Sequence, residues 1–315
     1  MAINFPDQPN LYVYDKHRQR VGINQPDRSF FFFGSGSTGN SVYLKDSHLL
    51  IDLGFPFSRY VDMVPNFWYD VRYILLTHEH SDHLNEATLM HLLDVYPHLK
   101  FFISKRMFER ITGIMFYTRF NKNKQKARLQ QESIRNKYYR RFIIIEADAN
   151  NKPLHIYPHD LVLQPTTIIP HFVSHADIVN VAYEIITPKH HVLYASDLDH
   201  VFAPKPKDSS PIETTLSLPL EYDSLGNVKP FTHPFDIIFL EANYDADYLH
   251  KFLQLHPEDP HAQGNLRHIS EQEAFNYIKY ALSDNGIFIP LHASQAFGTL
   301  VQDLRSTETT SQYNN

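Results

Sequence analysis

The stretch that decides the fold is 73–83, Tyr-Ile-Leu-Leu-Thr-His-Glu-His-Ser-Asp-His. Its apolar start predicts a buried strand. His78 and His80 are separated by one residue, so in an extended segment they point the same way. The chain then turns, and Asp82 and His83 can face a neighbouring point. One loop can therefore offer two ligands to each of two metal ions, and imidazole with carboxylate suits zinc, manganese or iron. The alternative, a His-rich surface loop, is disfavoured by this order of residues directly after an apolar run.

Composition supports a metal site built on imidazole and carboxylate. The chain has 315 residues, enough for two domains or one large α/β domain, and contains 20 His and no Cys. The absence of Cys excludes disulfides, thiolate metal sites, Cys-ligated iron–sulfur clusters and Cys nucleophiles. Any transition metal must therefore be held mainly by His and carboxylates.

No apolar run approaches the roughly 20 residues of a membrane-spanning helix, and the first 20 residues lack the order of a signal peptide. We therefore expect a soluble, cytoplasmic protein without a membrane partner.

Charge is unevenly distributed along the chain. The net charge is −6, yet segment 119–141 carries nine basic residues and one acid, a net +8, which leaves −14 for the rest. This segment is interpreted as a basic insertion. It could track nucleic acid, with Phe120, Tyr138 and Tyr139 stacking on bases. A solvated helix or a disordered arm is the alternative.

Apolar runs and helical spacing predict an alternation of strands and helices in one domain, 30–315. Residues 1–29 are expected to form an N-terminal extension or an edge element, and 203–234 a loop excursion. Ser270 and Glu273 have the spacing of a capping box at the start of the last helix. Strands are predicted at 30–33, 42–44, 49–52, 73–76, 100–103, 142–145, 181–186, 192–194, 237–240 and 287–290, and helices at 86–96, 247–255 and 270–282.

The glycine-rich stretch 34–41, Gly-Ser-Gly-Ser-Thr-Gly-Asn-Ser, matches G-x-G-x-x-G by its letters. A dinucleotide-binding fingerprint requires a helix directly afterwards. Here 42–44 predicts a strand, so we reject that interpretation. Small residues in this loop would let backbone amides approach an anion, and a plain hairpin turn is the alternative.

The loop 78–83 resembles the metal-binding motif of the metallo-β-lactamase superfamily, and the resemblance extends from about residue 31 to about residue 294. It implies an α/β fold, a four-layer αβ/βα metallo-β-lactamase sandwich with the metals at the sheet edges. His175 is the expected third-motif ligand, with His171 as the weaker alternative. Asp197 is the expected bridging ligand, with Asp199 as the weaker alternative.

The C-terminal ligand of the superfamily is a His after the last strand, which His292 matches. The resemblance then implies two divalent metal ions, expected to be Zn²⁺ with Mn²⁺ as the alternative. Asp197 would be shared between them. The first ion would lie on His78, His80 and His175, and the second on Asp82, His83 and His292.

Two further motifs resemble the ribonuclease Z-like and YycJ-type nuclease branches. The stretch 240–245, Leu-Glu-Ala-Asn-Tyr-Asp, resembles an element whose Glu orients a His, and Arg-His-Ile-Ser at 267–270 resembles the element that supplies that His. For this sequence, the resemblance implies that Glu241 orients His268. Tyr244 stands where the YycJ-type signature has His, a departure that leaves this position without an implied role. The glycine-rich loop is also similar to the turn that opens these branches.

The resemblance implies a metal-dependent phosphodiesterase with Asp82, His268 and Glu241 as its catalytic set. Asp82 would bind metal and orient the attacking hydroxide, and His268 would be the general acid toward the leaving group. The favoured substrate is DNA or RNA. Alternatives are 3′,5′-cyclic nucleotides, as in a phage enzyme that counters nucleotide signalling, and esters, thioesters or lactones. A non-enzymatic, metal-stabilised binding module is a further alternative. A homodimer is expected by analogy.

Overall fold

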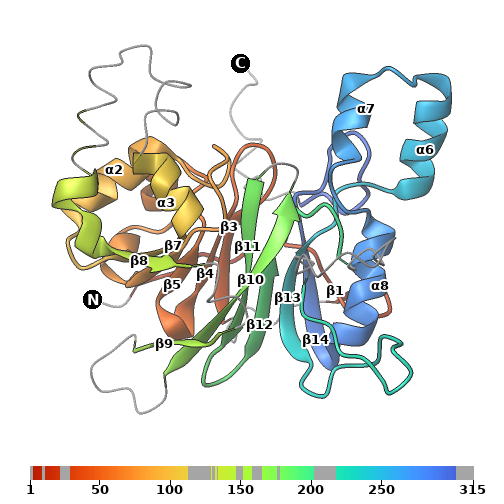
Figure 1. Cartoon of the computed structure of the whole chain (residues 1–315), viewed down its shortest axis with the longest axis horizontal. Helices are drawn as coiled ribbons and strands as arrows, with labels where there is room; N and C mark the ends of the chain where they lie inside the picture. Colours follow the sequence, from red (N-terminus) through yellow and green to blue (C-terminus); the bar gives the residue numbers. More distant parts are fainter. Residues whose placement is uncertain are drawn as a thin grey trace, which may run out of the picture.

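The computed structural model describes residues 3–8, 11–21, 29–112, 129, 132, 134–146, 152–157, 165–175, 178–201 and 218–302. Two β-sheets pack face to face, and helices cover both outer faces (Figure 1). This is the four-layer αβ/βα sandwich predicted from the sequence. Among the described residues, no helix combines the length and apolarity that crossing a membrane requires.

The first sheet has six strands in the order β3-β4-β5-β6-β7-β8, antiparallel at its start and parallel from β5 onward. Its outer face is covered by α1, α2 and α3, whose buried side chains share one apolar cluster with the sheet. The strands are β3 (Phe30–Gly34), β4 (Ser41–Leu44), β5 (Leu49–Ile51), β6 (Tyr73–Leu75), β7 (Lys100–Ser104) and β8 (Phe142–Ile145), and the helices are α1 (Phe57–Met63), α2 (Glu86–Val95) and α3 (Lys105–Thr112).

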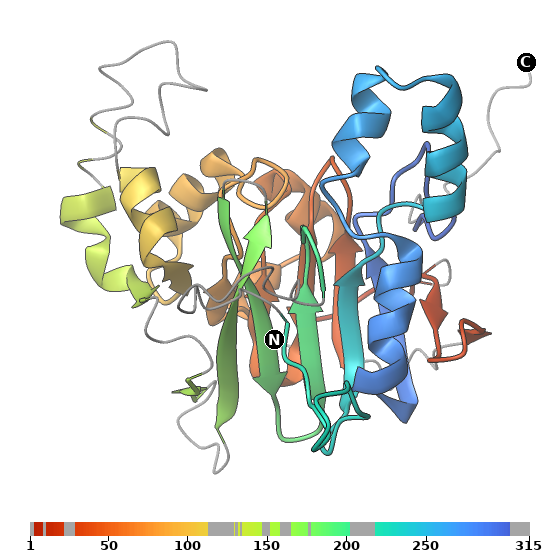
Figure 2. The same cartoon turned by 45° about the vertical axis from the view of Figure 1, so that its right-hand side comes forward.

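The second sheet has eight strands in the order β2-β1-β14-β13-β12-β11-β10-β9. Helix α8 (Glu271–Ala281) packs on its outer face, as Figure 2 shows. The strands are β1 (Val13–Tyr14), β2 (Arg20–Val21), β9 (Leu154–Ile156), β10 (Thr166–His175), β11 (Ile178–Ile186), β12 (His191–Ala195), β13 (Phe235–Glu241) and β14 (Leu282–Leu291).

The run of four phenylalanines in β3 shows why several strands lack polar alternation. Phe30 and Phe32 point into the cluster between the two sheets, whereas Phe31 and Phe33 point into the cluster under α1 and α2. Both faces of the strand are buried, so every position is apolar. The glycine-rich loop after β3 leads into β4 and not into a helix, which agrees with the rejection of a dinucleotide fingerprint.

The N-terminal segment contributes to the sandwich. Ile3 and Phe5 pack against the first sheet's outer cluster, and Gln8 bonds the backbone of β3. Strand β1 then pairs with β14 and forms the edge of the second sheet with β2. Of the two alternatives for this segment, the edge element describes the structure.

Two helices, α6 (Ala246–Leu255) and α7 (Pro260–Asn265), project from the end of β13 as a helical arm (Figure 2). Each begins with an aspartate cap, because the Asp245 carboxylate accepts from the Tyr248 N–H and the Asp259 carboxylate from the Ala262 N–H. A small apolar cluster of Leu249 and Ala262 with Phe297 fixes the arm on the segment after β14.

Only half of the expected capping box at α8 forms. The Ser270 Oγ accepts from the Glu273 N–H at 3.1 Å, as an N-cap should. The Glu273 carboxylate, however, accepts from the Val201 N–H at 2.9 Å instead of reaching back to its own helix start. Spacing predicts the cap correctly, but the long-range contact decides where the glutamate points.

Most of the basic insertion and half of the loop excursion lie outside the described residues, as does Phe120. Within the described part, Tyr138 is only 5% exposed, and its hydroxyl donates to Asp94. The expectation that Tyr138 stacks on bases is therefore wrong. Arg141 donates to backbone carbonyls of 93, 96 and 99, so its charge is used within the fold.

Candidate metal centre and active site

The predicted ligands meet at one edge of the sandwich because they stand at the ends of strands. The loop 78–83 follows β6 of the first sheet. In the second sheet, β10, β12 and β14 run in the same direction, so their carboxyl ends share an edge. His175 ends β10, Asp197 comes two residues after β12, and His292 directly follows β14. Residues far apart in sequence thus converge on the His-rich loop.

The first group of ligand atoms lies within 4.8 Å of one another and contains His78, His80, His175 and Asp197. His78 Nε2 lies 3.1 Å from His80 Nδ1 and 3.2 Å from Asp197 Oδ2. The His175 ring centre is 5.2 Å from that of His80. Three imidazoles and one carboxylate around one point match the donor set that zinc accepts.

The second group contains Asp82, His83, His292 and again Asp197, with its ligand atoms within the same 4.8 Å. His83 Nε2 lies 2.7 Å from Asp197 Oδ2, and His292 Nε2 lies 3.3 Å from Asp82 Oδ2. The structure therefore brings together both expected ligand sets, with Asp197 between them.

Polar atoms without partners show that this cluster fits metal ions. His175 Nδ1 and Asp197 Oδ1 are buried and have no hydrogen-bond partner among the described residues. Burial lowers the pKa of both His80 and His175 to about 4, so their imidazoles are neutral near pH 7, the form that coordinates metal. Buried polar atoms are otherwise almost always paired, so these free ligand atoms fit bound cations.

Three of the six non-glycine residues with positive φ in the described part of the chain lie at the same edge. Asp52, Asp197 and His292 have φ values of 60°, 55° and 51°, in the left-handed region. Each stands at the end of a strand whose next residues build the site. Such conformations cost about 1–3 kcal/mol for non-glycine residues and are typical of functional sites.

Glu241 and His268 form a close pair beside the second ligand group. Glu241 is fully buried at the end of β13, and its Oε1 lies 2.6 Å from His268 Nδ1. Its Oε2 accepts from the Leu198 N–H at 2.6 Å, which ties the pair to the Asp197 loop. Burial lowers the pKa of His268, but the neighbouring carboxylates, led by Glu241, outweigh this effect and raise the pKa to about 9.

Two residues that position ligands were missed by the sequence interpretation. Asp52 Oδ2 lies 2.7 Å from His83 Nδ1, so the carboxylate orients the ring and its Nε2 faces the metal cluster. Asn40 donates to Asp82 Oδ2 at 3.3 Å and accepts from the Ser35 hydroxyl. An aspartate directly after a buried strand was the available signal for Asp52, whereas nothing local marked Asn40.

Gly54 is required by the close approach of two loops. A Cβ at this position would lie 1.9 Å from the Asp82 carbonyl oxygen and 2.4 Å from the Asn40 nitrogen. Only glycine lets the chain after β5 pass between the metal loop and the glycine-rich loop.

The weaker alternatives lie outside the ligand groups. His171 pairs with Glu184 at 2.9 Å, four residues before His175 on β10. Asp199 accepts from the Ser174 hydroxyl at 2.7 Å. Tyr244 packs against the helical-arm cluster, and its carbonyl accepts from the Glu271 N–H. These residues have structural contacts that account for them.

The glycine-rich loop supports the site, and two of its amides are already engaged within the loop. The Gly36 N–H donates to Asn40 Oδ1, and the Gly39 N–H donates to the Gly36 carbonyl, so both are already used. Ser35 accepts from the His292 N–H at 2.8 Å, which fixes the backbone of a ligand. The expectation of an anion-binding loop is therefore wrong for these two amides.

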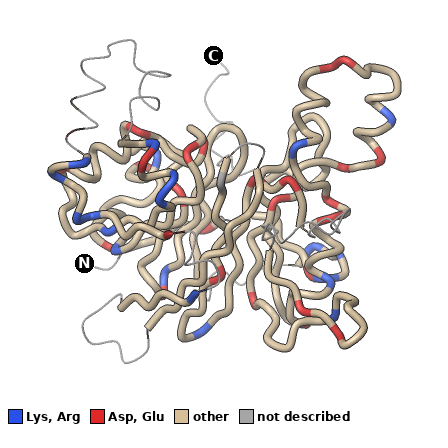
Figure 3. The backbone as a smooth tube through the Cα atoms, viewed as in Figure 1, with Lys and Arg blue, Asp and Glu red and all other residues tan. Residues whose placement is uncertain are grey.

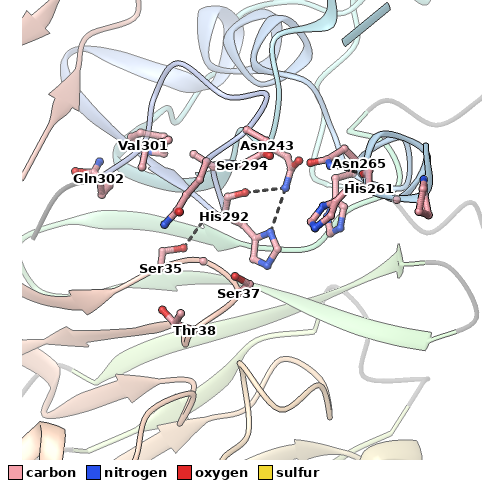
Figure 4. A pocket seen from close by; sticks show the side chains of 18 residues that line it. Ser35, Ser37, Thr38, Asn243, His261, Asn265, His292, Ser294, Val301 and Gln302 are labelled. Atoms are coloured by element: carbon pink, nitrogen blue, oxygen red, sulfur yellow. Dashed lines mark hydrogen bonds between the residues drawn. The ribbon is translucent and has the colours of Figure 1, made fainter. Parts of the chain in front are cut away.

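A pocket of about 620 Å³ opens beside His268 and His292 (Figure 4). The glycine-rich loop lines one side with Ser35, Ser37 and Thr38. The opposite side is lined by Asn243, by α7 and by the segment after β14. A ligand in this pocket would lie against the candidate proton donor.

No protein-family model matches the chain, and no curated protein matches it. Solved structures are similar to it over most of its length at low identity. One is the metallo-β-lactamase fold protein YhfI from Bacillus subtilis, which is 17% identical; the match covers 69% of this chain and 72% of that chain, with a TM-score of 0.40. A second is the short form of human tRNase Z, which is 12% identical; the match covers 85% of this chain and 93% of that chain, with a TM-score of 0.48. A third is a diphosphatase from the PhnP family, which is 13% identical; the match covers 80% of this chain and 81% of that chain, with a TM-score of 0.38. The two-sheet sandwich, with helices on both outer faces and His and Asp residues at its strand ends, has the four-layer αβ/βα architecture that the sequence predicted.

Proposed function

We propose that the protein is a metal-dependent phosphodiesterase, and specifically a nuclease that hydrolyses DNA or RNA. The observation that carries this proposal is the Glu241–His268 pair, 2.6 Å apart and adjoining two metal-ligand groups that share Asp197. Hydrolysis of a phosphodiester needs charge neutralisation at phosphorus and a proton for the leaving oxygen. The two ligand groups and the pair provide residues for each requirement.

The metal ions in this proposal are two divalent cations, preferably Zn²⁺ because imidazole dominates the donor set, with Mn²⁺ as the second choice. When bound, they supply an activated water and neutralise charge on the phosphate. His78, His80 and His175 would hold one ion and Asp82, His83 and His292 the other, with Asp197 common to both. Asp52 holds His83 in the orientation that this binding requires.

His268 is the residue that delivers a proton to the leaving group. Its Nδ1 is engaged by Glu241, so Nε2 is the nitrogen left for a substrate oxygen. Glu241 is fully buried and tied to the Leu198 N–H, so it stabilises the imidazolium in one orientation. General acids held in this way contribute about 10²–10⁴-fold to rate.

A 3′,5′-cyclic nucleotide is the second candidate substrate, and the pocket favours it. Among the described residues that line the pocket there is no Lys or Arg, although a polymer track would need cations for successive phosphates. Many basic residues lie on the lobe formed by α2, α3 and β8, and fewer lie on the helical arm and beside α8 (Figure 3).

Product analysis by chromatography separates these substrates. The purified protein, with zinc or manganese, would be incubated with 3′,5′-cyclic nucleotides and with 5′-phosphorylated single- and double-stranded DNA and RNA oligonucleotides. The nuclease proposal predicts shortened oligonucleotides that His80→Ala does not produce. If linear mononucleotides form while the oligonucleotides stay intact, the protein is a cyclic-nucleotide phosphodiesterase and not a nuclease.

Turnover assays also test two other functional classes for this protein. Hydrolysis of carboxyl esters, thioesters or lactones without any phosphodiester turnover would place the protein in a different class of hydrolase. No turnover of any substrate, with metal bound, would support a metal-stabilised binding module.

A further inference from the structure

The pocket beside the candidate active site has an unusual chemical character for a phosphate-processing site. Hydroxyl, amide and imidazole groups line it, and no Asp, Glu, Lys or Arg is among the described residues that do so. His268 and His292 belong to the candidate active site and would face the phosphate, whereas the other side chains of the wall are uncharged and can form hydrogen bonds with an uncharged polar group. The pocket therefore suits the uncharged part of a substrate.

Asn243 provides an independent sign of a missing ligand. It lines the pocket and is 4% exposed. Its Nδ2 donates to the His292 carbonyl at 2.7 Å, but its Oδ1 is buried and has no hydrogen-bond partner among the described residues. An unpaired buried acceptor costs about 1–3 kcal/mol, so Asn243 is a residue of the pocket wall whose hydrogen bonding is incomplete in this structure.

The helical arm places two further polar side chains at the pocket. His261 and Asn265 of α7 line it from the side of Asn243, opposite Ser37 (Figure 4). The Asp259 cap and the buried Ala262 hold α7 in place, so these side chains are presented by a fixed element. Gln263 lies on the same helix but does not line the pocket.

We propose that this pocket binds the nucleoside that carries the leaving oxygen, with His261, Asn265 and Asn243 as residues that determine specificity. His268, the candidate donor of the leaving-group proton, lines the same pocket, so the departing group must lie next to it. A base and a sugar together are uncharged, rich in hydrogen-bonding groups and of a size that 620 Å³ accommodates. This inference rests on the proposed phosphodiesterase function.

The first test measures binding without chemistry. Adenosine, guanosine, cytidine and uridine would be titrated into the metal-loaded full chain by calorimetry. At least one nucleoside should bind, with an affinity that does not depend on salt because the ligand is uncharged. His261→Ala and Asn265→Ala should each weaken binding about tenfold, as expected for one lost hydrogen bond, and Gln263→Ala should change it less than twofold. No binding of any nucleoside, or equal affinities in all variants, would overturn the proposal.

The second test uses turnover to locate the subsite. For dinucleotides, His261→Ala should raise KM about tenfold and alter selectivity only for the base on the leaving side. Gln263→Ala, whose side chain does not line the pocket, should leave KM and base selectivity unchanged within twofold. Selectivity that shifts only for the base on the other side would contradict the assignment.

The two proposals fail in different ways. If nucleosides bind but no phosphodiester is hydrolysed, the proposed function is wrong and the pocket remains a nucleoside site. If bis(p-nitrophenyl) phosphate is hydrolysed but no nucleoside binds, the proposed function stands and the pocket assignment is wrong.

Discussion

Two clusters of histidine and carboxylate in this fold use the same residue types and differ in whether those residues satisfy one another. At the sandwich edge, His175 Nδ1 and Asp197 Oδ1 are buried without hydrogen-bond partners among the described residues. In the second sheet, Glu184 accepts from His171 through one oxygen and from His191 through the other, both at 2.9 Å. The first cluster has open ligand atoms, whereas the carboxylate of the second is saturated.

This difference teaches that residue type alone does not identify a site. Glu184 is stabilised where it stands, because its two histidines lower its pKa to about 2 although burial acts in the opposite direction. Asp197 receives no such complete set of donors, and its backbone is also strained. Buried ligand atoms without hydrogen-bond partners, together with a strained backbone, distinguish a binding cluster from a structural one.

The largest expected effect comes from removing the shared ligand. Asp197→Asn should lower phosphodiesterase activity at least about 10³-fold, because both ligand groups lose their common carboxylate. Steady-state kinetics with bis(p-nitrophenyl) phosphate measures it. Glu184→Gln is the matched control at the saturated cluster and should retain activity within about twofold. Equal losses in both variants would remove the distinction between the clusters.

His268→Ala should lower activity about 10²–10⁴-fold while the metal content stays unchanged, because the proton donor is lost and the ligand groups remain. Steady-state kinetics with a dinucleotide measures the loss of activity, and elemental analysis of the same preparation measures the metal content. Full activity in this variant would refute the assigned role of His268.

Asp52→Asn should weaken metal binding without abolishing it. Asparagine tolerates the left-handed backbone at this position but cannot stabilise the His83 ring as the carboxylate does. Metal affinity, measured by competition with a chelating dye, should fall about 10–100-fold. An unchanged affinity would show that His83 needs no orienting partner.

The smallest expected effect is a change in the free energy of unfolding at the saturated cluster around Glu184. Because the pKa of Glu184 is lowered from 4.5 to about 2, its stabilisation is present above pH 4.5 and is lost as the pH falls toward 2. Glu184→Gln should therefore reduce the free energy of unfolding by about 1–3 kcal/mol at pH 7, and this deficit should shrink below pH 4.5. Chemical denaturation across this range measures it, and a deficit that grows toward acid pH would contradict the assignment.

The sequence predicted the parts of the site that local patterns encode. The loop 78–83 was recognisable because its ligands are contiguous, and His292 because it follows a predicted strand, whereas His175 was chosen through the family resemblance alone. The roles of Asn40 and Gly54 were not predictable, since they depend on which loops meet in space. Tyr138 was misjudged for the same reason: an aromatic residue in a basic run reads as exposed until its packing partners are known.

Metal content of the purified protein tests the central claim most directly. After dialysis against buffer containing a trace of zinc, elemental analysis should find about two ions per chain in the wild type and in Glu184→Gln, and fewer than one in Asp197→Asn. A wild type without bound metal, or an Asp197→Asn variant that keeps the full complement, would contradict the account.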